Sequence, residues 1–303
     1  MNNTIDIEGI SKSYGDVHAL NGISLHVGPG EIFGLIGPDG AGKTTLFRIM
    51  TTLMLPDSGT GTVCGLDIVK DCSRLRRIIG YMPGRFSLYQ DLTVKENLDY
   101  FATLFGTTVK DNYENIKEIY SQIEPFADRR AGKLSGGMKQ KLALCCALVH
   151  KPSVLFLDEP TTGVDAVSRK DFWAMLSRIR ASGVTVLVST PYMDEAARCD
   201  RLALIRDGSV IGMGSPEEIT AGFPFRLLAV KGSRMYPVLK ILRGTEGVIS
   251  CFSFGDSHHL TYDPEVTGRE RILETLADAG FDDCTAREIR PGVEDCFMWL
   301  SHN

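Results

Sequence analysis

The stretch GPDGAGKTT, residues 37–45, constrains the fold of this chain more than any other segment. It fits the pattern G-x-x-x-x-G-K-[ST], with Lys43 and Thr44 as its last two positions. The apolar run Ile32–Ile36 precedes it, and apolar residues recur at helical spacing after it until residues 56–59 stop the pattern. We therefore expect a buried strand, a glycine loop and a helix in that order.

A loop of this composition is suited to holding phosphate. Glycines lack Cβ atoms, so successive backbone N–H groups can close around phosphate oxygens, and a helix that begins at Lys43 directs its positive end at them. Lys43 would reach the β- and γ-phosphates, and Thr44 would ligate Mg²⁺. An incidental glycine turn is the other interpretation, but the flanking strand and helix favour a site for ATP and Mg²⁺. The expected ATP-binding residues of the loop are Gly37, Pro38, Asp39, Gly40, Ala41, Gly42, Lys43, Thr44 and Thr45.

Two carboxylates, Asp158 and Glu159, follow the apolar run at residues 154–157. A magnesium phosphate site needs a carboxylate at the end of a nearby strand. We expect Asp158 to hold Mg²⁺ through water, and Glu159 to act as the general base that polarises an attacking water. A solvated acidic turn is the alternative, and the four apolar residues that run directly into the pair weigh against it.

Length and composition limit the remaining possibilities. A chain of 303 residues is expected to form one large domain and a smaller one. No uninterrupted apolar run approaches the roughly 18 residues of a membrane span, so any membrane role is expected to come through a partner. The net charge of −5 gives no general attraction to phosphate backbones and disfavours a nucleic-acid partner. The eight cysteines form no C-x-x-C pair and are interpreted as reduced thiols, with Cys145 and Cys146 packed in a core.

The first part of the chain has the pattern of an α/β domain. Alternating apolar residues predict two antiparallel strands, around residues 5–7 and 23–27. A mostly helical middle is expected over about residues 93–149. Buried strands at 154–157 and 184–188 flank a helix, which indicates βαβ alternation and a parallel sheet. Asp207-Gly208 predicts a hairpin that closes the domain near Ile219.

From Phe223 onward the predicted order is strand, helix, strand, strand, helix, strand and helix, which is compatible with a small α+β ferredoxin-like module. We therefore predict domains at residues 1–222 and 223–303. The second contains no recognisable catalytic group. His258 and His259 suggest a metal, yet neighbours on a strand point to opposite faces, so ordinary strand residues are favoured.

The stretch LSGGMKQ, residues 134–140, resembles the signature of the ATP-binding cassette (ABC) family. A serine and two glycines would open a helix there and offer a hydroxyl and bare N–H groups, which makes a second anion site. One phosphate does not need two such loops in one chain. The resemblance implies that the signature of one cassette caps the ATP held by another, so a second cassette, identical or different, is an expected partner. The signature positions are Leu134, Ser135, Gly136, Gly137, Met138 and Gln140.

The resemblance covers about residues 4–219. Tyr14 matches the aromatic residue that stacks on adenine, with an ordinary surface tyrosine as the alternative, and Asp165 lies in a segment that looks like the D-loop linking the two sites. Residues 92–106 and 292–300 are similar to exporters of the multidrug ABC-2 group. The family implies a P-loop ATPase domain with a parallel core sheet, an antiparallel β subdomain and a helical subdomain. It also implies a separate transmembrane permease subunit and a cytoplasmic location at the inner face of the cell membrane.

Two positions depart from the family pattern, and both concern the γ-phosphate. The family places glutamine where Gly84 stands and histidine where Pro191 stands. Neither glycine nor proline has a side chain that donates or accepts a hydrogen bond. Removing one preorganised contact to developing charge commonly lowers a rate by about 10²- to 10³-fold. We therefore expect ATP binding with slow turnover at this chain's own site, while Glu159 and the intact signature argue against complete loss.

Two other functions stay open beside that of an exporter ATPase. The first is a non-transport cassette of translation or DNA repair. Repair cassettes carry a long arm between the glycine loop and the signature, for which the roughly one hundred residues present here are too few. Translation cassettes come as two on one chain, and we find one. The second is a regulatory subunit that binds ATP with little hydrolysis, a hypothesis that depends on Gly84 and Pro191.

Overall fold

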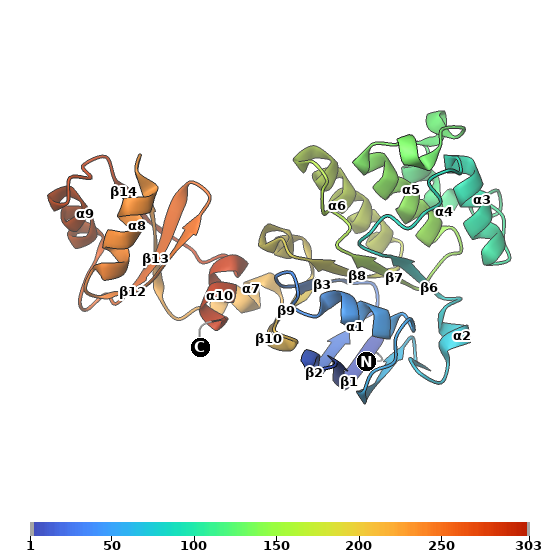
Figure 1. The fold of residues 1–303 in the computed structure, drawn as a ribbon, viewed down its shortest axis with the longest axis horizontal. Helices are drawn as coiled ribbons and strands as arrows, with labels where there is room; N and C mark the ends of the chain where they lie inside the picture. The colour runs from blue at the N-terminus through green and yellow to red at the C-terminus, as the bar shows by residue number, and fades with distance from the viewer. Residues whose placement is uncertain (1–2, 302–303) are drawn as a thin grey trace. The chain divides into compact units, whose positions relative to one another are not determined.

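The computed structural model describes residues 3–301, which form two compact units (Figure 1). The first unit ends at Pro216 and the second begins at Glu217, within the short helix α7 (Pro216–Ala221). The domain boundary expected after residue 222 stays a prediction. Among the described residues, none of the helices combines the length and the apolar character that crossing a bilayer requires.

A six-stranded sheet forms the centre of the first unit, in the order β10-β9-β3-β8-β7-β6. Its strands pair in parallel except for β10, which returns antiparallel to β9. The parallel sheet is thus confirmed, as is the hairpin, whose turn residues Asp207 and Gly208 both have positive φ, +48° and +75°. The strands are β3 (Ile32–Ile36), β6 (Ile79–Met82), β7 (Val154–Asp158), β8 (Thr185–Thr190), β9 (Arg201–Arg206) and β10 (Ser209–Gly214).

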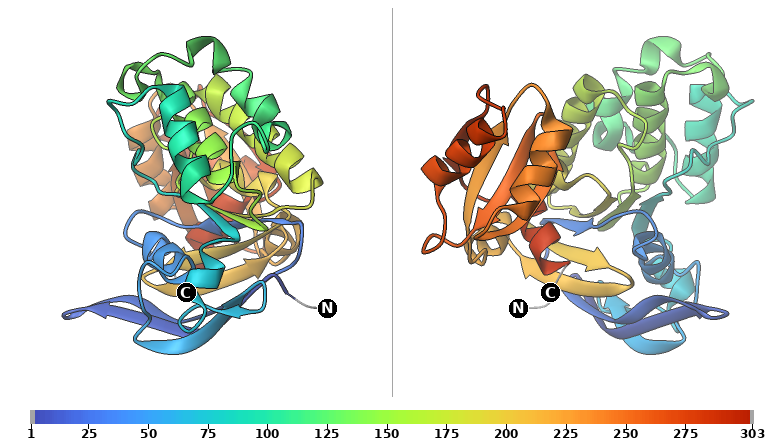
Figure 2. Two further views of the ribbon diagram at one scale, coloured as in Figure 1. Left: turned by 90° about the vertical axis from the view of Figure 1, so that its right-hand side faces the viewer. Right: turned by 60° about the vertical axis from the view of Figure 1, so that its left-hand side comes forward.

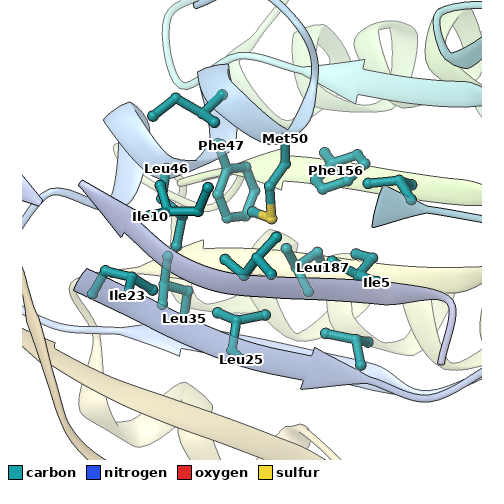
Figure 3. Close-up of a cluster of buried hydrophobic side chains, with 14 of the residues drawn as sticks. Ile5, Ile10, Ile23, Leu25, Leu35, Leu46, Phe47, Met50, Phe156 and Leu187 are labelled. Carbon is teal, nitrogen blue, oxygen red and sulfur yellow. The ribbon is translucent and has the colours of Figure 1, made fainter. Parts of the chain in front are cut away.

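A second sheet of the first unit is four-stranded and antiparallel, in the order β2-β1-β4-β5. The two strands expected before the glycine loop are confirmed, and Ile5 lies opposite Val27. One face of this sheet, helix α1 and the central sheet enclose the main core, in which Phe47 meets Phe156 edge to face at 5.8 Å (Figure 3). The elements are β1 (Ile5–Tyr14), β2 (Val17–Val27), β4 (Ser58–Val63), β5 (Leu66–Asp67) and α1 (Lys43–Met50).

Helix α1 is shorter than its apolar pattern predicts. The periodic positions up to Met50 are buried, but Leu53 is 58% exposed. The helix ends because Thr52 adopts a positive φ of +63°, after which the N–H groups of Leu53 and Met54 both bond to the carbonyl of Arg48. The expectation that Leu53 and Met54 extend the helical face is therefore wrong.

The predicted helical middle is confirmed as three helices and two short 3-10 turns. These green helices gather at the end of the first unit opposite the blue antiparallel sheet (Figure 2). Cys145 and Cys146 are buried on α5, as expected, together with Leu142 and Val149. The remaining elements of this unit are α2 (Cys72–Leu75), α3 (Val94–Leu104), α4 (Tyr113–Tyr120), η1 (Glu124–Phe126), η2 (Ala131–Lys133), α5 (Gly136–Leu148), α6 (Ala166–Ala181) and η3 (Met193–Arg198).

The second unit has the predicted order βαββαβα. Its four-stranded antiparallel sheet, ordered β12-β13-β11-β14, has the arrangement of a ferredoxin-like module. Helices α8 and α9 cover one face, where Val238, Leu242, Ile272 and Leu276 pack into a separate core. The elements are β11 (Arg226–Lys231), α8 (Met235–Gly244), β12 (Val248–Phe254), β13 (Ser257–Tyr262), α9 (Arg269–Asp278), β14 (Thr285–Ile289) and α10 (Val293–Leu300).

The two adjacent histidines of β13 have different surroundings. His258 is buried, and its Nε2 lies 2.7 Å from the carbonyl oxygen of Met235, at the start of α8. The Nδ1 of His259 lies 2.7 Å from Asp295 Oδ1, on α10. Each ring is thus engaged by a different helix.

Candidate functional site

The glycine loop connects β3 to α1, and two of its glycines are required by close packing. A Cβ atom on Gly37 would lie 2.1 Å from the carbonyl oxygen of Ile205. At Gly42 a Cβ would lie 2.4 Å from the carbonyl oxygen of Ala19, and φ is +100°. Only glycine satisfies these conditions, so the loop can pass tightly from the sheet into the helix.

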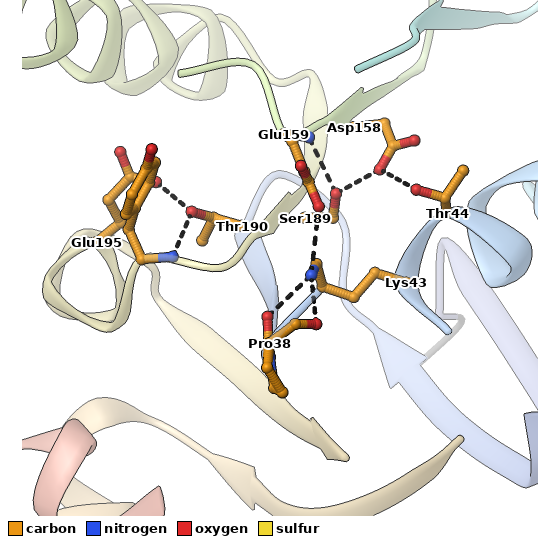
Figure 4. A network of polar contacts seen from close by, with 10 residues as sticks. Pro38, Lys43, Thr44, Asp158, Glu159, Ser189, Thr190 and Glu195 are labelled. Carbon is orange, nitrogen blue, oxygen red and sulfur yellow. Dashed lines mark hydrogen bonds and ion pairs between the residues drawn. The ribbon is translucent and has the colours of Figure 1, made fainter. Parts of the chain in front are cut away.

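Lys43 is drawn into this loop and is only 3% exposed. Its ammonium donates to the carbonyl oxygens of Gly37 (2.8 Å) and Pro38 (2.9 Å), and Glu159 Oε1 lies 3.3 Å away (Figure 4). These three oxygens match the three donors of a lysine ammonium. The Lys43 ammonium thus lies where the phosphates are expected, and the carboxylate of Glu159 balances its charge.

Asp158 ends β7 and is almost completely buried, at 2% exposure. Its Oδ1 accepts hydrogen bonds from Thr44 Oγ1 (3.2 Å) and Ser189 Oγ (2.6 Å). Both bonds end on Oδ1, so Oδ2 remains a carboxylate acceptor beside the Thr44 hydroxyl. Carboxylate and hydroxyl oxygens are ligands that Mg²⁺ prefers, so this predicted pair fits the ion.

Glu159 has a strained backbone. Its φ is +49°, in the left-handed region that non-glycine residues rarely adopt. The conformation is held because its N–H lies 3.0 Å from both the carbonyl oxygen and the Oγ of Ser189. Its carboxylate thereby turns towards Lys43, and the structure brings the expected base to the mouth of the loop.

A buried carboxylate that the sequence did not single out braces this region. Glu195 is 1% exposed, and it accepts hydrogen bonds from Thr190 Oγ1 (2.6 Å) and Thr161 Oγ1 (2.8 Å). It thereby ties the end of β8 to the segment that follows Glu159. Its bond from Thr190 can be followed in Figure 4. Glu195 gives the site rigidity.

Ser189 was also missed, although the sequence carries a signal for it. It follows the apolar run at 184–188 just as Asp158 follows the run at 154–157. Polar residues at the ends of adjacent parallel strands meet at one edge of the sheet. That rule, applied to both strands, finds Ser189 as the partner of Asp158.

Both departures from the family pattern lie beside this site. A Cβ on Gly84 would lie 3.0 Å from the carbonyl oxygen of Asp158 and 3.7 Å from Glu159 Cβ. Pro191 directly follows Thr190, whose carbonyl oxygen accepts a 3.3 Å hydrogen bond from the N–H of Gly37. Gly84 therefore borders the two carboxylates, and Pro191 borders the start of the glycine loop.

Tyr14 lies at the rim of the same site. Its hydroxyl is 3.5 Å from Thr45 Oγ1 and donates to Met54 Sδ at 3.0 Å, and the residue is 46% exposed. The structure thus places an accessible aromatic ring beside the first turn of α1. Its contact with adenine stays a prediction.

The signature loop lies apart from the glycine loop. Ser135 caps α5 by accepting a 3.4 Å hydrogen bond from Met138 N–H, and Ser135 and Gly136 are exposed. Within residues 3–301, no hydrogen bond or ion pair joins the signature to residues 37–45. The exposed residues Ser135 and Gly136 therefore make no bond to this chain's own glycine loop within the described residues.

The signature loop instead borders the predicted D-loop. A Cβ on Gly137 would lie 3.0 Å from Ser168 Oγ, in the first turn of α6. Asp165 caps that helix, accepting hydrogen bonds from the N–H groups of Val167 (3.1 Å) and Ser168 (3.0 Å). These bonds, chiefly the one from Ser168, lower the pKa of the Asp165 carboxyl.

A strand, a glycine loop and a helix that bring a lysine to two carboxylates at the edge of a parallel sheet define a P-loop nucleotide-binding domain. Comparison with known families extends this assignment, since the family model described as "ABC transporter" matches residues 20–162. The "Nod factor export ATP-binding protein I" of Paraburkholderia xenovorans is 41% identical over 72% of this chain and 72% of its own length. The chain belongs to the ABC transporter family.

A second relative matches the whole chain. The Escherichia coli protein named "Probable multidrug ABC transporter ATP-binding protein YbhF" is 39% identical over 98% of this chain, and this chain spans about half of it, 52%.

Solved structures agree with the fold of the first unit. A Clostridium perfringens protein, part of an ABC transporter complex, superimposes with a TM-score of 0.66 and 27% identity, covering 73% of this chain and 92% of that one. A dimeric ATP-binding cassette bound to ADP and Pi in a post-hydrolysis state has a TM-score of 0.63 and 25% identity, with 70% and 98% coverage. The predicted cassette fold is confirmed.

Proposed function

We propose that this chain binds and hydrolyses ATP as the nucleotide-binding subunit of an ABC-2 type exporter. The observation that carries the proposal is the convergence of four polar side chains on the glycine loop. The names of the two relatives, one a multidrug ABC transporter protein and the other an export protein, support the exporter assignment. The four converging residues are Lys43, Thr44, Asp158 and Glu159.

The same contacts outline how the residues would act. Lys43 would exchange the carbonyl oxygens of Gly37 and Pro38 for phosphate oxygens, which are stronger acceptors because they are charged. Glu159 would then lose its lysine partner and accept the proton of an attacking water. Thr44 and Asp158 would hold Mg²⁺, which when bound offsets the charge of the phosphates.

Turnover at this site is proposed to be slow, because Gly84 and Pro191 add no donor or acceptor beside Glu159 and the loop. The same observation favours the second candidate function, a regulatory subunit that binds ATP without useful hydrolysis. Release of phosphate from Mg-ATP separates the two, with Glu159→Gln as the reference without the base. A parent rate above that reference supports the ATPase, and an equal rate identifies the regulatory subunit.

We also propose that a second cassette completes the ATP site. Ser135 and Gly136 are exposed at the start of α5, and within residues 3–301 neither bonds to the glycine loop of this chain. The dimeric cassette among the similar structures supports this pairing. The signature would bind the phosphates held by the partner, through the Ser135 hydroxyl and the free N–H groups of the first turn.

The first unit also offers a surface for the proposed transmembrane subunit, at the inner face of the membrane. A groove of about 420 Å³ lies between the central sheet and the helical region, with Tyr81 and Phe105 in its lining. Leu53 (58% exposed) and Leu104 (62% exposed) also line it. Apolar side chains that stay this exposed in a groove mark a site for a partner.

This docking proposal is tested with membranes from the source cell, stripped of peripheral proteins. The double variant Leu53→Ser and Leu104→Ser should bind them several-fold more weakly than the parent, while its affinity for ATP is unchanged. Val69→Ser is the matched control, because Val69 is an exposed apolar residue (45%) outside the groove. Equal binding by all three proteins would exclude the groove as the docking site.

A further inference from the structure

The second unit contains a pocket of about 610 Å³ on its sheet, a size typical of small-molecule sites. The lining residues Phe252 and His259 lie opposite each other on β12 and β13, as do Ser250 and Thr261. Between these two pairs, Cys251 lies opposite Leu260, and Leu260 packs in the core under α8 and α9. Most of the lining therefore belongs to the face that these helices leave uncovered, while Arg243 joins it from α8 itself.

One wall of the pocket is aromatic. Phe223, Phe225 and Trp299 meet edge to face in all three pairs, with ring centroids 5.9, 6.0 and 6.4 Å apart. Mutual contacts of this kind fix the rings in place. The pocket thus offers a preformed apolar surface.

The pocket also has polar lining residues, and their one carboxylate, that of Asp295, is already hydrogen-bonded. His259 Nδ1 donates to Asp295 Oδ1 at 2.7 Å, because an ionised carboxylate can only accept. Asp295 Oδ2 accepts from Gly292 N–H at 2.8 Å. Each oxygen of Asp295 is thus already bonded within the second unit.

Arg243 is a positively charged lining residue that has no carboxylate partner among the described residues. It lines the pocket from α8 and donates from Nε to the carbonyl oxygen of Cys251 at 3.0 Å. Across residues 3–301, no carboxylate lies within ion-pair distance of its guanidinium. The remaining N–H groups of this guanidinium suit an anionic group.

We propose that this pocket binds an amphipathic organic acid, with its apolar or aromatic body against Phe223, Phe225 and Trp299 and its acid group at Arg243. This pocket is separate from the proposed ATP site. Neither the glycine loop, residues 37–45, nor Asp158 or Glu159 contributes to its lining. The second unit is then a ligand-binding module in its own right.

The test uses the full chain and two fluorescent probes of the same shape. One is the anion 1-anilinonaphthalene-8-sulfonate, and the other is its uncharged analogue N-phenyl-1-naphthylamine. Arg243→Gln should weaken binding of the anion by about tenfold or more and leave the neutral probe unchanged. Arg243→Lys should retain part of the anion affinity. Lys240→Gln, which removes an exposed charge from the same helix outside the pocket, should change neither.

The location of the probe is read by energy transfer from tryptophan. The chain has two tryptophans, and Trp173 lies buried in the first unit. In Trp173→Phe, transfer from Trp299 alone should therefore persist. Unchanged binding of the neutral probe to Arg243→Gln also shows that the pocket is still folded. Three results would each overturn the proposal. The first is an equal affinity of Arg243→Gln and the parent for the anionic probe, and the second is an equal loss of that affinity in Arg243→Gln and Lys240→Gln. The third is the absence of energy transfer to the probe in Trp173→Phe.

Discussion

Replacing Pro191 by histidine is expected to accelerate ATP hydrolysis by this chain by about 10²-fold, with little change in its affinity for ATP. The position follows Thr190, whose carbonyl oxygen bonds to the first residue of the glycine loop, so an imidazole there would be attached next to the proposed phosphate site. One preorganised contact to developing charge changes a rate by about 10²- to 10³-fold. Because the contact strengthens in the transition state, it acts on the chemical step rather than on binding.

Gly84→Gln, by contrast, is expected to give little net gain. Its Cβ would lie 3.0 Å from the carbonyl oxygen of Asp158, and β7 is buried along its whole length and has little room to yield. Crowding of this kind costs about 1–3 kcal/mol of folding stability. Its relief requires the backbone of Asp158 to move, which would misplace the carboxylate that Thr44 contacts and offset the gain from the new amide. Gly84→Ala isolates this cost, since alanine adds the Cβ without the amide.

The assay is steady-state phosphate release from Mg-ATP for the parent, each single variant and the double variant, with ATP affinity measured by calorimetry. Pro191→His should be the fastest single variant, and Gly84→Ala should be no faster than the parent. A structure of Pro191→His locates the imidazole. If the ring points at the phosphates and the rate is unchanged, the reasoning fails. A parent already as fast as the histidine variant refutes the slow-site hypothesis directly.

Three further outcomes are expected. Lys43→Ala should weaken Mg-ATP binding by about 10²-fold, because charged hydrogen bonds to the phosphates are lost; unchanged affinity in calorimetry would contradict the site. Glu159→Gln with ATP should dimerise in light scattering, and a monomer at high protein and ATP concentrations would exclude a homodimer. Burial lowers the pKa of His150 below its usual value of 6.5, so the folded state favours the neutral imidazole. This contribution to the free energy of unfolding is fully present above pH 6.5 and is lost as the pH falls through the lower pKa of the folded state. The urea midpoint of the parent should therefore fall more between about pH 7.5 and pH 5 than that of His150→Gln, and parallel profiles would count against this.

Much of the fold was accessible from the sequence because its signals are local. Glycines at Gly37 and Gly42, an apolar run before them and periodic residues after them specify a strand, a loop and a helix without distant contacts. Apolar runs also located Asp158 at a strand end. The order of the second unit followed from hydrophobic period alone, since each of its elements is short and continuous.

The features that escaped prediction depend on contacts between distant segments. The charged side chain of Glu195 gives no sign in the sequence that it is buried. It hydrogen-bonds Thr161, after β7, and Thr190, at the end of β8, so its position depends on how these segments come together. The end of α1 depends on one backbone angle at Thr52, which the periodic pattern does not encode. The crowding at Gly84 likewise exists only once β6 and β7 are paired, since it arises from the carbonyl oxygen of Asp158.

The close approach of Gly137 to Ser168 has a mechanical consequence. From Glu159 the chain turns through bonds from Thr162 N–H to the Glu159 carbonyl oxygen and from Val164 N–H to the Thr161 carbonyl oxygen, both 3.2 Å, and then enters α6. The segment from Glu159 to α6 is short and held by its own hydrogen bonds, so we expect it to move as a rigid unit. We therefore expect a shift of the signature loop that presses on α6 to reach the backbone of Glu159. The signature loop and Glu159, the proposed base, are thus joined by one continuous run of contacts within the first unit.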